Sequence, residues 1–342
     1  MPVRMPRRAR PAGYCGTVAR MDPAWDTEHL PDQTGRVFLI TGATAGLGFF
    51  AAAQLARTGA HVILSGRNPN RLSASRAAIM RRVPDASTES ILLDVTKGGS
   101  IRSAAATLRS RERLDGIILN AGVVHPPKQR EEAEGHELVL QTNVLGHFAL
   151  AGELLPALAR TGLKTPGARM VWLGSVSVAS WRSRDLAPEL EAGYKVARAY
   201  VQSKFLVQAL AAEADRRLRA ADVPVASVIA HPGYSLGGRS AGIAGVNQPS
   251  RLKRFLANLQ APIAQSKEAG ATNEVRALID PAVGPGDMVG PVGRLRGEPR
   301  ITDRDARNPL TAISVEPEVG AAAWAFCEDA TRTVWPFARF GR

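Results

Sequence analysis

Cysteine and aromatic residues are scarce in this chain of 342 residues. It has two cysteines, Cys15 and Cys327, and 5% aromatic residues. Two cysteines cannot build a disulfide framework or a cysteine-rich zinc module, so we expect a reducing compartment, the cytoplasm. The six histidines lack the paired spacing of metal ligands, and we predict no metal site. With 45% hydrophobic and 22% charged residues, the composition is that of an ordinary globular protein.

Carboxylates are outnumbered by basic residues, and the formal net charge is +13. Five of the arginines lie in residues 1–20, which contain no carboxylate. A nucleic-acid binder needs a localised basic patch on its folded part, so we expect no nucleic-acid partner. Residues 1–20 also lack the apolar run of a secretory signal. We interpret them as a disordered basic tail, followed by one domain at 21–342 with Met21 as the working start.

Residues 37–56 contain no charge and have the length of a membrane-spanning helix. Three glycines interrupt this run, and its β-branched residues lie near its start. This order favours a buried strand at 37–41, a glycine turn, and a helix at 47–57. We therefore predict no integral membrane segment.

The same alternation of strand and helix continues along the chain. Apolar runs typical of buried strands lie at residues 61–65, 90–94, 116–119, 170–173 and 225–229. Helical patterns lie between them, at about 70–82, 99–112, 136–160 and 192–221. Continuous apolar strands that alternate with helices predict an α/β fold with a doubly wound parallel sheet. The pattern weakens after residue 236, and we treat 236–342 as part of the same domain.

Thr41 to Gly48, which reads Thr-Gly-Ala-Thr-Ala-Gly-Leu-Gly, joins the first strand to the first helix. The N–H groups and dipole of a helix start favour an anion, and glycines let a pyrophosphate approach the backbone. The spacing Gly-x-x-x-Gly-x-Gly differs from the Gly-x-Gly-x-x-Gly fingerprint, and no Gly-Lys-Ser/Thr ending indicates a P-loop. Many strand-to-helix turns need a glycine without binding anything, but the position after the first strand favours a dinucleotide.

A tyrosine and a lysine lie on one face of the helix expected at 192–221. Tyr200 precedes Lys204 by four residues, so the ammonium can lower the pKa of the phenol. A phenol tuned in this way can exchange a proton with an alcohol or carbonyl oxygen. Tyr194 is followed four residues later by Arg198, which cannot relay a proton near neutral pH. An isolated Tyr-x-x-x-Lys occurs by chance, so the neighbouring motifs decide its meaning.

Taken in order, these motifs resemble those of the short-chain dehydrogenase/reductase family over about residues 34–235. The matching residues are the glycine motif from Thr41 to Gly48, Asn120-Ala121-Gly122, Asn143 within a helix, Ser175, Tyr200 with Lys204, and Pro232-Gly233. Within the family, His231-Pro232-Gly233 and the later Gly290-Pro291 are similar to the retinol-dehydrogenase and protochlorophyllide-reductase-like branch. The resemblance implies a Rossmann fold and a hydride transfer between NAD(P) and a carbonyl or alcohol.

The resemblance also implies four catalytic roles. Tyr200 would be the general acid/base, and Ser175 would hydrogen-bond the substrate oxygen. Lys204 would lower the tyrosine pKa and hold the nicotinamide ribose, and Asn143 would support a proton-relay water. The family often has Ser-Ser where this chain has Gly-Ser, which leaves Ser177 as a rival, but Ser175 falls in the matching place.

By the same resemblance, the cofactor contacts lie at the ends of several strands. They are Gly42, Thr44, Ala45, Gly46, Leu47, Gly48, Asn120, Ala121, Gly122, Tyr200, Lys204, Pro232 and Gly233. After Pro232-Gly233 the family commonly has a threonine that binds the carboxamide of the cofactor. This chain has Tyr234-Ser235-Leu236-Gly237 instead, which puts that contact in doubt.

The end of the second strand indicates which cofactor is preferred. An NAD site usually has Asp or Glu there, about twenty residues after the glycine turn, to bind the ribose hydroxyls. Residues 33–84 contain no carboxylate, and the strand is followed by Arg67, which can pair with a 2′-phosphate. We therefore predict NADPH over NADH, with Asp94 and Val95 contacting the adenine; Arg67 as a solvated loop residue is the alternative.

Residues 236–265 combine four glycines with Leu252, Phe255, Leu256 and Leu259 at helical spacing. They could form a lid over the nicotinamide that suits lipophilic substrates, or an ordinary core-facing helix. A hydrolase is disfavoured because Gly-x-Ser-x-Gly is absent around Ser175. The second function class is a catalytically silent dinucleotide-binding regulator of the same fold. Family resemblance also implies a homodimer or homotetramer with a small-molecule substrate.

Overall fold

The computed structural model describes residues 25–181, 183, 194–302, 308, 310–337 and 340. The predicted tail at residues 1–20 therefore lies outside the described residues, as do the first two residues of the helix expected at 192–221.

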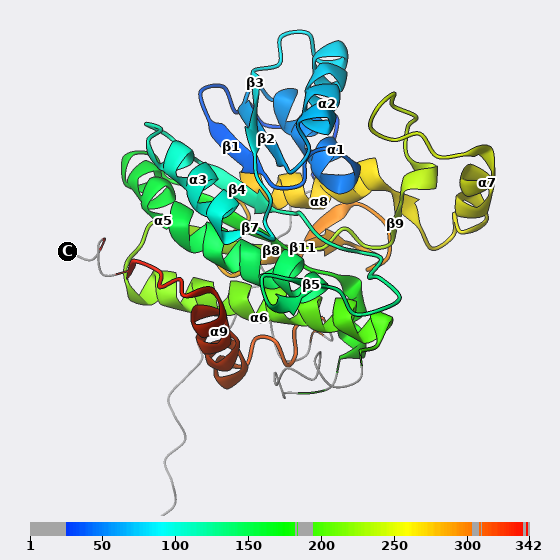
Figure 1. Cartoon of the computed structure of the whole chain (residues 1–342). Coiled ribbons are helices and arrows are strands. Elements are labelled where there is room, and N and C mark those ends of the chain that lie inside the picture. Colours follow the sequence, from blue (N-terminus) through cyan, green and yellow to red (C-terminus); the bar gives the residue numbers. More distant parts are fainter. Residues whose placement is uncertain are drawn as a thin grey trace, which may run out of the picture.

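The centre of the molecule is an eight-stranded sheet with the order β12-β11-β8-β7-β4-β1-β2-β3 (Figure 1). Neighbouring strands are parallel except for β11 and β12. The bounds are β1 Val37–Ile40, β2 His61–Gly66, β3 Thr88–Leu92, β4 Gly116–Leu119, β7 Arg169–Leu173, β8 Ala226–Ala230, β11 Met288–Pro291 and β12 Pro299–Thr302. The predicted α/β fold with a doubly wound sheet is confirmed.

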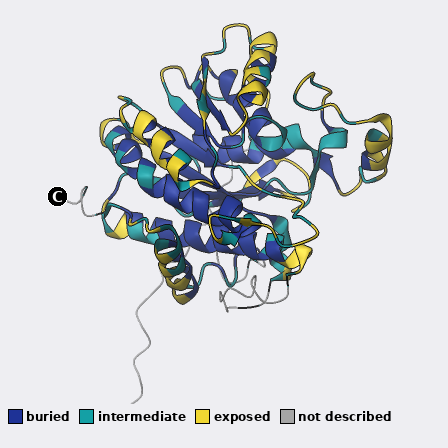
Figure 2. Ribbon diagram, in the orientation of Figure 1, coloured by how far each residue is buried: buried dark blue, intermediate teal, exposed yellow. Residues whose placement is uncertain are grey.

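Helices cover both faces of the sheet. On one face lie α3, α5, α6 and α9, at Gly98–Arg109, Gly146–Lys164, Val196–Ala220 and Pro317–Thr331. On the other face lie α1, α2 and α8, at Gly46–Ala56, Pro69–Arg82 and Lys267–Ile279. Each layer has its own cluster of buried apolar side chains, and Figure 2 shows that the sheet-facing sides are buried.

The strands read as continuous apolar runs because both of their faces are covered. In β1, Leu39 packs into the cluster under α3 and α5, whereas Phe38 and Ile40 pack into the cluster under α1 and α8. In β4, Ile117 and Ile118 divide in the same way. Side chains of a strand alternate between its faces, so each strand needs apolar residues at nearly every position.

A helical stretch from Leu138 to Lys164 is long and apolar enough to cross a membrane, but 89% of its most apolar window is buried inside the fold. It consists of α4 (Leu138–Leu140), a π-helical segment (Gln141–Leu145) and α5. We therefore interpret it as a core helix. The π-helical segment contains Asn143, and such segments are frequent at functional sites.

Residues after 236 complete the sheet and its cover. β11 and β12 extend it beyond β8, α8 packs along α1, and α9 packs on α6. Trp324 and Trp335 from the C-terminal part pack against Phe148 of α5, with ring centroids 4.9 and 5.5 Å from that ring. The C-terminal part therefore contributes to the same core as the motifs of the first 235 residues.

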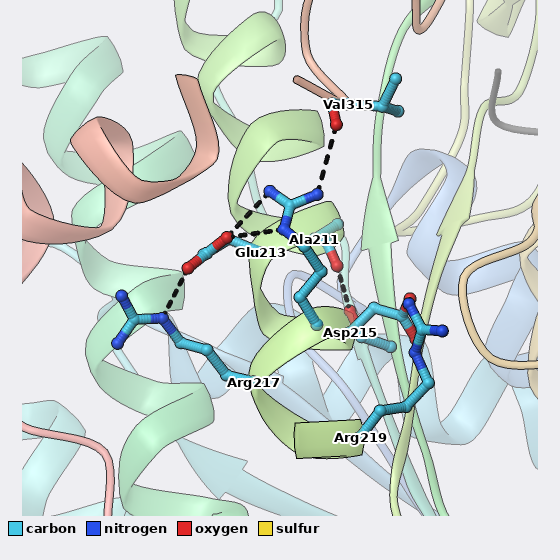
Figure 3. A network of polar contacts seen from close by, with 8 residues as sticks. Ala211, Glu213, Asp215, Arg217, Arg219 and Val315 are labelled. Carbon is cyan, nitrogen blue, oxygen red and sulfur yellow. Dashed lines mark hydrogen bonds and ion pairs between the residues drawn. The ribbon is translucent and has the colours of Figure 1, made fainter. Parts of the chain in front are cut away.

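Ion pairs and backbone contacts hold the C-terminal half of α6 in place (Figure 3). Glu213 accepts hydrogen bonds from Arg216 and Arg217, and Arg216 also donates to Val315 O in the segment before α9. Ser227 Oγ of β8 donates to Ala211 O at 2.8 Å. These contacts fix α6 against the sheet, and α6 carries Tyr200 and Lys204 near its other end.

Candidate active site

The glycine turn between β1 and α1 lies tightly against the end of β4. Gly42 and Gly46 have φ values of +68° and +62°, which L side chains rarely adopt. A Cβ on Gly42 would lie 2.9 Å from Ala121 Cα, and one on Gly48 would overlap the amide of Asn120. These glycines are therefore required by backbone conformation and by close approach.

Polar contacts join the two turns directly. Asn120 Nδ2 donates to Thr41 O at 2.6 Å, and Thr41 Oγ1 accepts from the backbone N–H groups of Asn120 and Ala121 at 2.8 and 2.9 Å. The structure thus brings together the predicted cofactor residues at 41–48 and 120–122.

His147 connects this junction to the π-helical segment. Its Nδ1 lies 3.2 Å from Asn143 O and its Nε2 lies 3.0 Å from Thr41 Oγ1. A carbonyl oxygen can only accept, so Nδ1 carries the proton and Nε2 is an acceptor that faces the hydroxyl of Thr41, whose Oγ1 also lies 3.2 Å from Ile118 O. Burial and then the charge of Lys204 lower the pKa of His147 to about 3. His147 is therefore neutral at physiological pH and acts as a structural link.

The start of α1 combines backbone N–H groups with a cation. The N-cap is Ala45, whose methyl group cannot accept a hydrogen bond from these N–H groups, and the first turn holds no acidic residue. Lys267, the first residue of α8, places its Nζ 3.2 Å from where a Cβ of Gly46 would lie. Burial lowers the pKa of Lys267, and no carboxylate among the described residues forms an ion pair with it. This donor set fits a pyrophosphate.

Sequence reasoning missed Lys267. It lies more than two hundred residues from the glycine turn and belongs to none of the motifs in residues 34–235. Only the packing of α8 along α1 brings it there, so no local signal could have found it.

Tyr200 and Ser175 form the pair expected from the motifs. The Tyr200 hydroxyl donates to Ser175 Oγ at 3.5 Å, and Ser175 caps the short 3-10 helix Val176–Ser180 that follows β7. Ser177 Oγ lies 2.9 Å from Ser175 Oγ. The three hydroxyls are thus adjacent, and it is Ser175 that lies within hydrogen-bond distance of Tyr200. Tyr194 instead donates to Pro127 O at 3.1 Å.

Lys204 is buried and donates from Nζ to Leu173 O at 2.8 Å. Burial lowers its pKa to about 8, and the opposing effect comes from the carboxyl group of Glu274. Glu274 of α8 is fully buried, neither of its oxygens has a hydrogen-bond partner in the described part of the chain, and burial raises its pKa to about 8. This second buried titratable group beside Lys204 was also missed, because it lies outside every motif.

The sequence expectation for the pKa of Tyr200 is not met in this structure. Burial raises the pKa of the phenol above 10.0, and the hydrogen bond with Ser175 opposes this only in part. The ammonium of Lys204 was expected to lower that pKa, but it bonds to the carbonyl of Leu173 instead. At neutral pH the phenol therefore holds its proton in this geometry.

The side chain of Asn143 is fully used by protein contacts. Its Oδ1 accepts from Val123 N at 2.8 Å, and its Nδ2 donates to Ser203 Oγ at 2.9 Å. Ser203 in turn donates to Tyr200 O at 2.8 Å. Asn143 therefore ties the segment after β4 to the turn of α6 that carries Tyr200.

Arg67 follows β2 and is exposed, and no ion pair to it is present among the described residues. A Cβ on its neighbour Gly66 would lie 2.8 Å from Thr44 Cγ2, so the backbone that carries Arg67 lies beside the glycine turn. Asn68 caps α2 by accepting from Arg71 N at 3.0 Å. The end of β2 thus offers a free guanidinium and no carboxylate.

The remaining predicted cofactor residues also lie in turns after strands. Asp94 Oδ1 accepts from the backbone and the hydroxyl of Thr96 at 3.0 and 2.7 Å. Val95 is buried, and its carbonyl lies where a Cβ of Gly146 would be. The carbonyl of Leu295 likewise approaches Gly233, which has φ +62°.

The side chains after Pro232-Gly233 turn to protein partners. Tyr234 Oη donates to Gln260 Oε1 at 2.6 Å, and Ser235 Oγ donates to Pro232 O at 2.8 Å. The carboxamide contact expected of a threonine here therefore has no evident substitute.

The predicted lid region contains β9 (Ser235–Leu236), which pairs with β10 (Gln265–Ser266), and the helix α7 (Arg251–Leu259). The core-facing alternative for this helix is wrong, because Leu252, Phe255, Leu256 and Leu259 are all exposed.

A cavity of about 480 Å³ lies beside α7 and includes His125. Its lining contains neither Ser175 nor Tyr200. We therefore do not place the reacting atoms in this cavity.

Comparison with known proteins now defines the class. The family model of the short chain dehydrogenases matches residues 36–236, more than half of the chain. The chain therefore belongs to this family.

Its relatives carry names from this class. A polyprenol dehydrogenase of Mus musculus is 36% identical over 207 residues, 60% of this chain and 61% of the relative. An uncharacterised oxidoreductase of Schizosaccharomyces pombe is 35% identical over 45% of this chain and 46% of the relative. The chain thus aligns with about half to two thirds of the length of these curated relatives.

Solved structures agree on the fold. A crystal structure of an uncharacterised protein from Mycobacterium paratuberculosis has a TM-score of 0.71 and 29% identity, covering 92% of this chain and all of the other. The complex of Pseudomonas aeruginosa RhlG with NADP has a TM-score of 0.58 at 23% identity, covering 76% of this chain and 95% of the other.

Proposed function

We propose that this protein is an NADPH-preferring oxidoreductase that interconverts a carbonyl group and an alcohol on a lipophilic substrate. The observation that carries the proposal is the hydrogen bond between Tyr200 and Ser175 beside the buried Lys204. The bound nicotinamide would supply or accept the hydride. The residues of this chain transfer the proton and orient the substrate.

Tyr200 is the general acid in reduction, because its phenol is protonated at neutral pH. It donates that proton to the substrate oxygen, and in oxidation its phenolate takes the proton back. Ser175 orients the same oxygen, since its hydroxyl already lies next to that of Tyr200. Asn143 is a positioning residue that acts through Ser203 on the Tyr200 turn.

Two cations bind the phosphates of the cofactor. Arg67 pairs with the 2′-phosphate, which an Asp or Glu at this place would repel. Lys267 pairs with the pyrophosphate at the start of α1. The name of the polyprenol dehydrogenase supports an apolar alcohol as the substrate class, as does the exposed apolar face of α7.

The test of the catalytic assignment is Tyr200→Phe. We expect turnover to fall at least about 100-fold while the Kd for NADPH stays nearly unchanged, because the phenol moves a proton and contributes little to binding. The substrate for this assay comes from a screen of aldehydes, ketones and quinones in which the oxidation of NADPH is measured. Near-normal turnover in the variant would refute the assignment, and no oxidation with any substrate would favour a dinucleotide-binding regulator.

The test of cofactor choice is a titration of NADPH and NADH against the wild type and Arg67→Ala. We expect the wild type to bind NADPH more tightly and the variant to lose that preference. Equal affinities of the wild type for NADPH and NADH would overturn the proposed NADPH preference. For the substrate class, more efficient reduction of small polar ketones than of bulky apolar carbonyl compounds would contradict a lipophilic substrate.

A further inference from the structure

Helix α7 carries an apolar face that the protein does not cover. Leu252, Phe255, Leu256 and Leu259 recur at the spacing of one helix face, and their exposed fractions are 66, 61, 48 and 64%. Ile263, just beyond the helix, is 50% exposed. Other exposed large apolar side chains, such as Leu163 of α5, do not form such a row. Patches of this kind mark interaction surfaces.

The opposite side of α7 is already attached to the protein. Ala257 is buried, and a Cβ on Gly238 would lie 2.6 Å from its Cβ. Arg254 donates to Ser240 O at 3.3 Å. Figure 1 shows α7 at the edge of the molecule, and Figure 2 colours most of this helix as exposed. Turning the apolar face toward the fold would break these attachments.

The charge on α7 has one sign. The helix carries Arg251, Lys253 and Arg254 and no carboxylate. Arg251 and Lys253 flank the apolar face, whereas Arg254 lies on the attached side. An amphipathic helix with an apolar face and flanking Lys and Arg is suited to the interface of an anionic bilayer, where the apolar residues enter the headgroup boundary and the cations meet phosphates.

We propose that the α7 face, defined as Leu252, Phe255, Leu256, Leu259 and Ile263, docks on the surface of a membrane that contains anionic lipids. The cavity of about 480 Å³ lies directly behind this face, since Lys253, Leu256 and Ala257 line it. The proposed docking goes beyond the proposed function and does not depend on it.

The experiment is co-sedimentation of the full chain with vesicles of phosphatidylcholine, alone or mixed with phosphatidylglycerol. We expect binding to the mixed vesicles that weakens as salt is raised. Phe255→Asp with Leu259→Asp should lower the partition constant at least about tenfold, because it removes apolar contact and adds repulsion. The control is Leu163→Asp, which adds one carboxylate at a leucine of α5 that is 69% exposed and should bind like the wild type.

Every other outcome overturns the proposal. Unchanged binding of the α7 double variant would assign vesicle binding to another basic segment, and equal loss in Leu163→Asp would make it a matter of net charge. A wild-type dimer that becomes a monomer in the double variant, by light scattering, would identify the face as a contact between copies. Kd for NADPH, measured without vesicles, should be the same in all variants, so failure here stays distinct from failure of the proposed function.

Discussion

Lys267 offers the sharpest test of how the chain binds its dinucleotide. Its Nζ lies beside Gly46 at the start of α1, and no carboxylate among the described residues pairs with it. A hydrogen bond to a charged group contributes about 1.5–3 kcal/mol. Lys267→Ala should therefore raise the Kd for the cofactor about 10- to 150-fold.

The pattern of losses distinguishes the two phosphate contacts. NADPH and NADH share the pyrophosphate, so Lys267→Ala should weaken both by the same factor. Arg67→Ala should weaken only NADPH, because NADH lacks the 2′-phosphate. Burial lowers the pKa of Lys267. The wild-type affinity should therefore fall as pH rises through that lowered pKa, where the ammonium loses its proton, and the variant should lack this dependence.

Isothermal titration calorimetry at several pH values measures these constants without turnover. Lys267→Ala keeps a good helix former at the first position of α8. Lys253→Ala is the matched control, since Lys253 lies in the same basic segment but lines the cavity beside α7. Unchanged constants in Lys267→Ala, or a loss confined to NADPH, would refute the pyrophosphate contact.

Four further substitutions, in three predictions, test the site and the core. Ser175→Ala should lower kcat by at least about 100-fold and Ser177→Ala only slightly, because Tyr200 bonds to Ser175; the reverse order would exchange their roles. Folded Glu274 has its pKa raised from 4.5 to about 8, so its contribution to stability is complete below pH 4.5 and is lost as pH rises through 8. Relative to wild type, Glu274→Gln should gain up to about 1.4 kcal/mol of unfolding free energy per pH unit across this window in urea titrations; a flat difference would contradict the buried carboxyl. Gly152→Ala should destabilise by about 1–3 kcal/mol, because its Cβ would lie 2.6 Å from the ring of Trp335; a raised Tm would contradict this packing.

The sequence predicted the strands and helices that are marked by a local pattern of apolar residues. Each strand from β1 to β8 in the parallel part was found because two covered faces demand continuous apolar runs. The bounds of β3 differ from the prediction, because β3 begins at Thr88 whereas the apolar run begins at residue 90. It is an edge strand whose Glu89 and Ser90 are not buried, so apolarity marked it poorly. The short strands β11 and β12 were not predicted. β12 is the other edge strand and begins with Pro299. β11 is buried, but its four residues include Gly290 and Pro291, which are not typical of a strand.

The residues of the candidate site are likewise of two kinds, those that a sequence motif marks and those that only the fold brings together. Gly42, Asn120 and Tyr200 lie within ordered motifs, so the resemblance located them and the structure brings the first two into contact. Lys267 and Glu274 gain their positions only through the packing of α8, which no spacing in the sequence encodes. Residues of this second kind need the fold before they can be recognised.

The raised pKa of Tyr200 predicts how the two directions of the reaction depend on pH. Reduction uses the protonated phenol, so its rate should stay constant through neutral pH and fall only above the raised pKa. Oxidation needs the phenolate, so its rate should rise about tenfold per pH unit up to that pKa. Profiles of kcat for both directions between pH 6 and 10 measure this, and Tyr200→Phe should remove the rise. If oxidation has already reached its plateau at pH 7, the phenolate is populated there. Lys204 would then have left Leu173 O to lower the phenol pKa, as the Tyr-x-x-x-Lys spacing alone suggests.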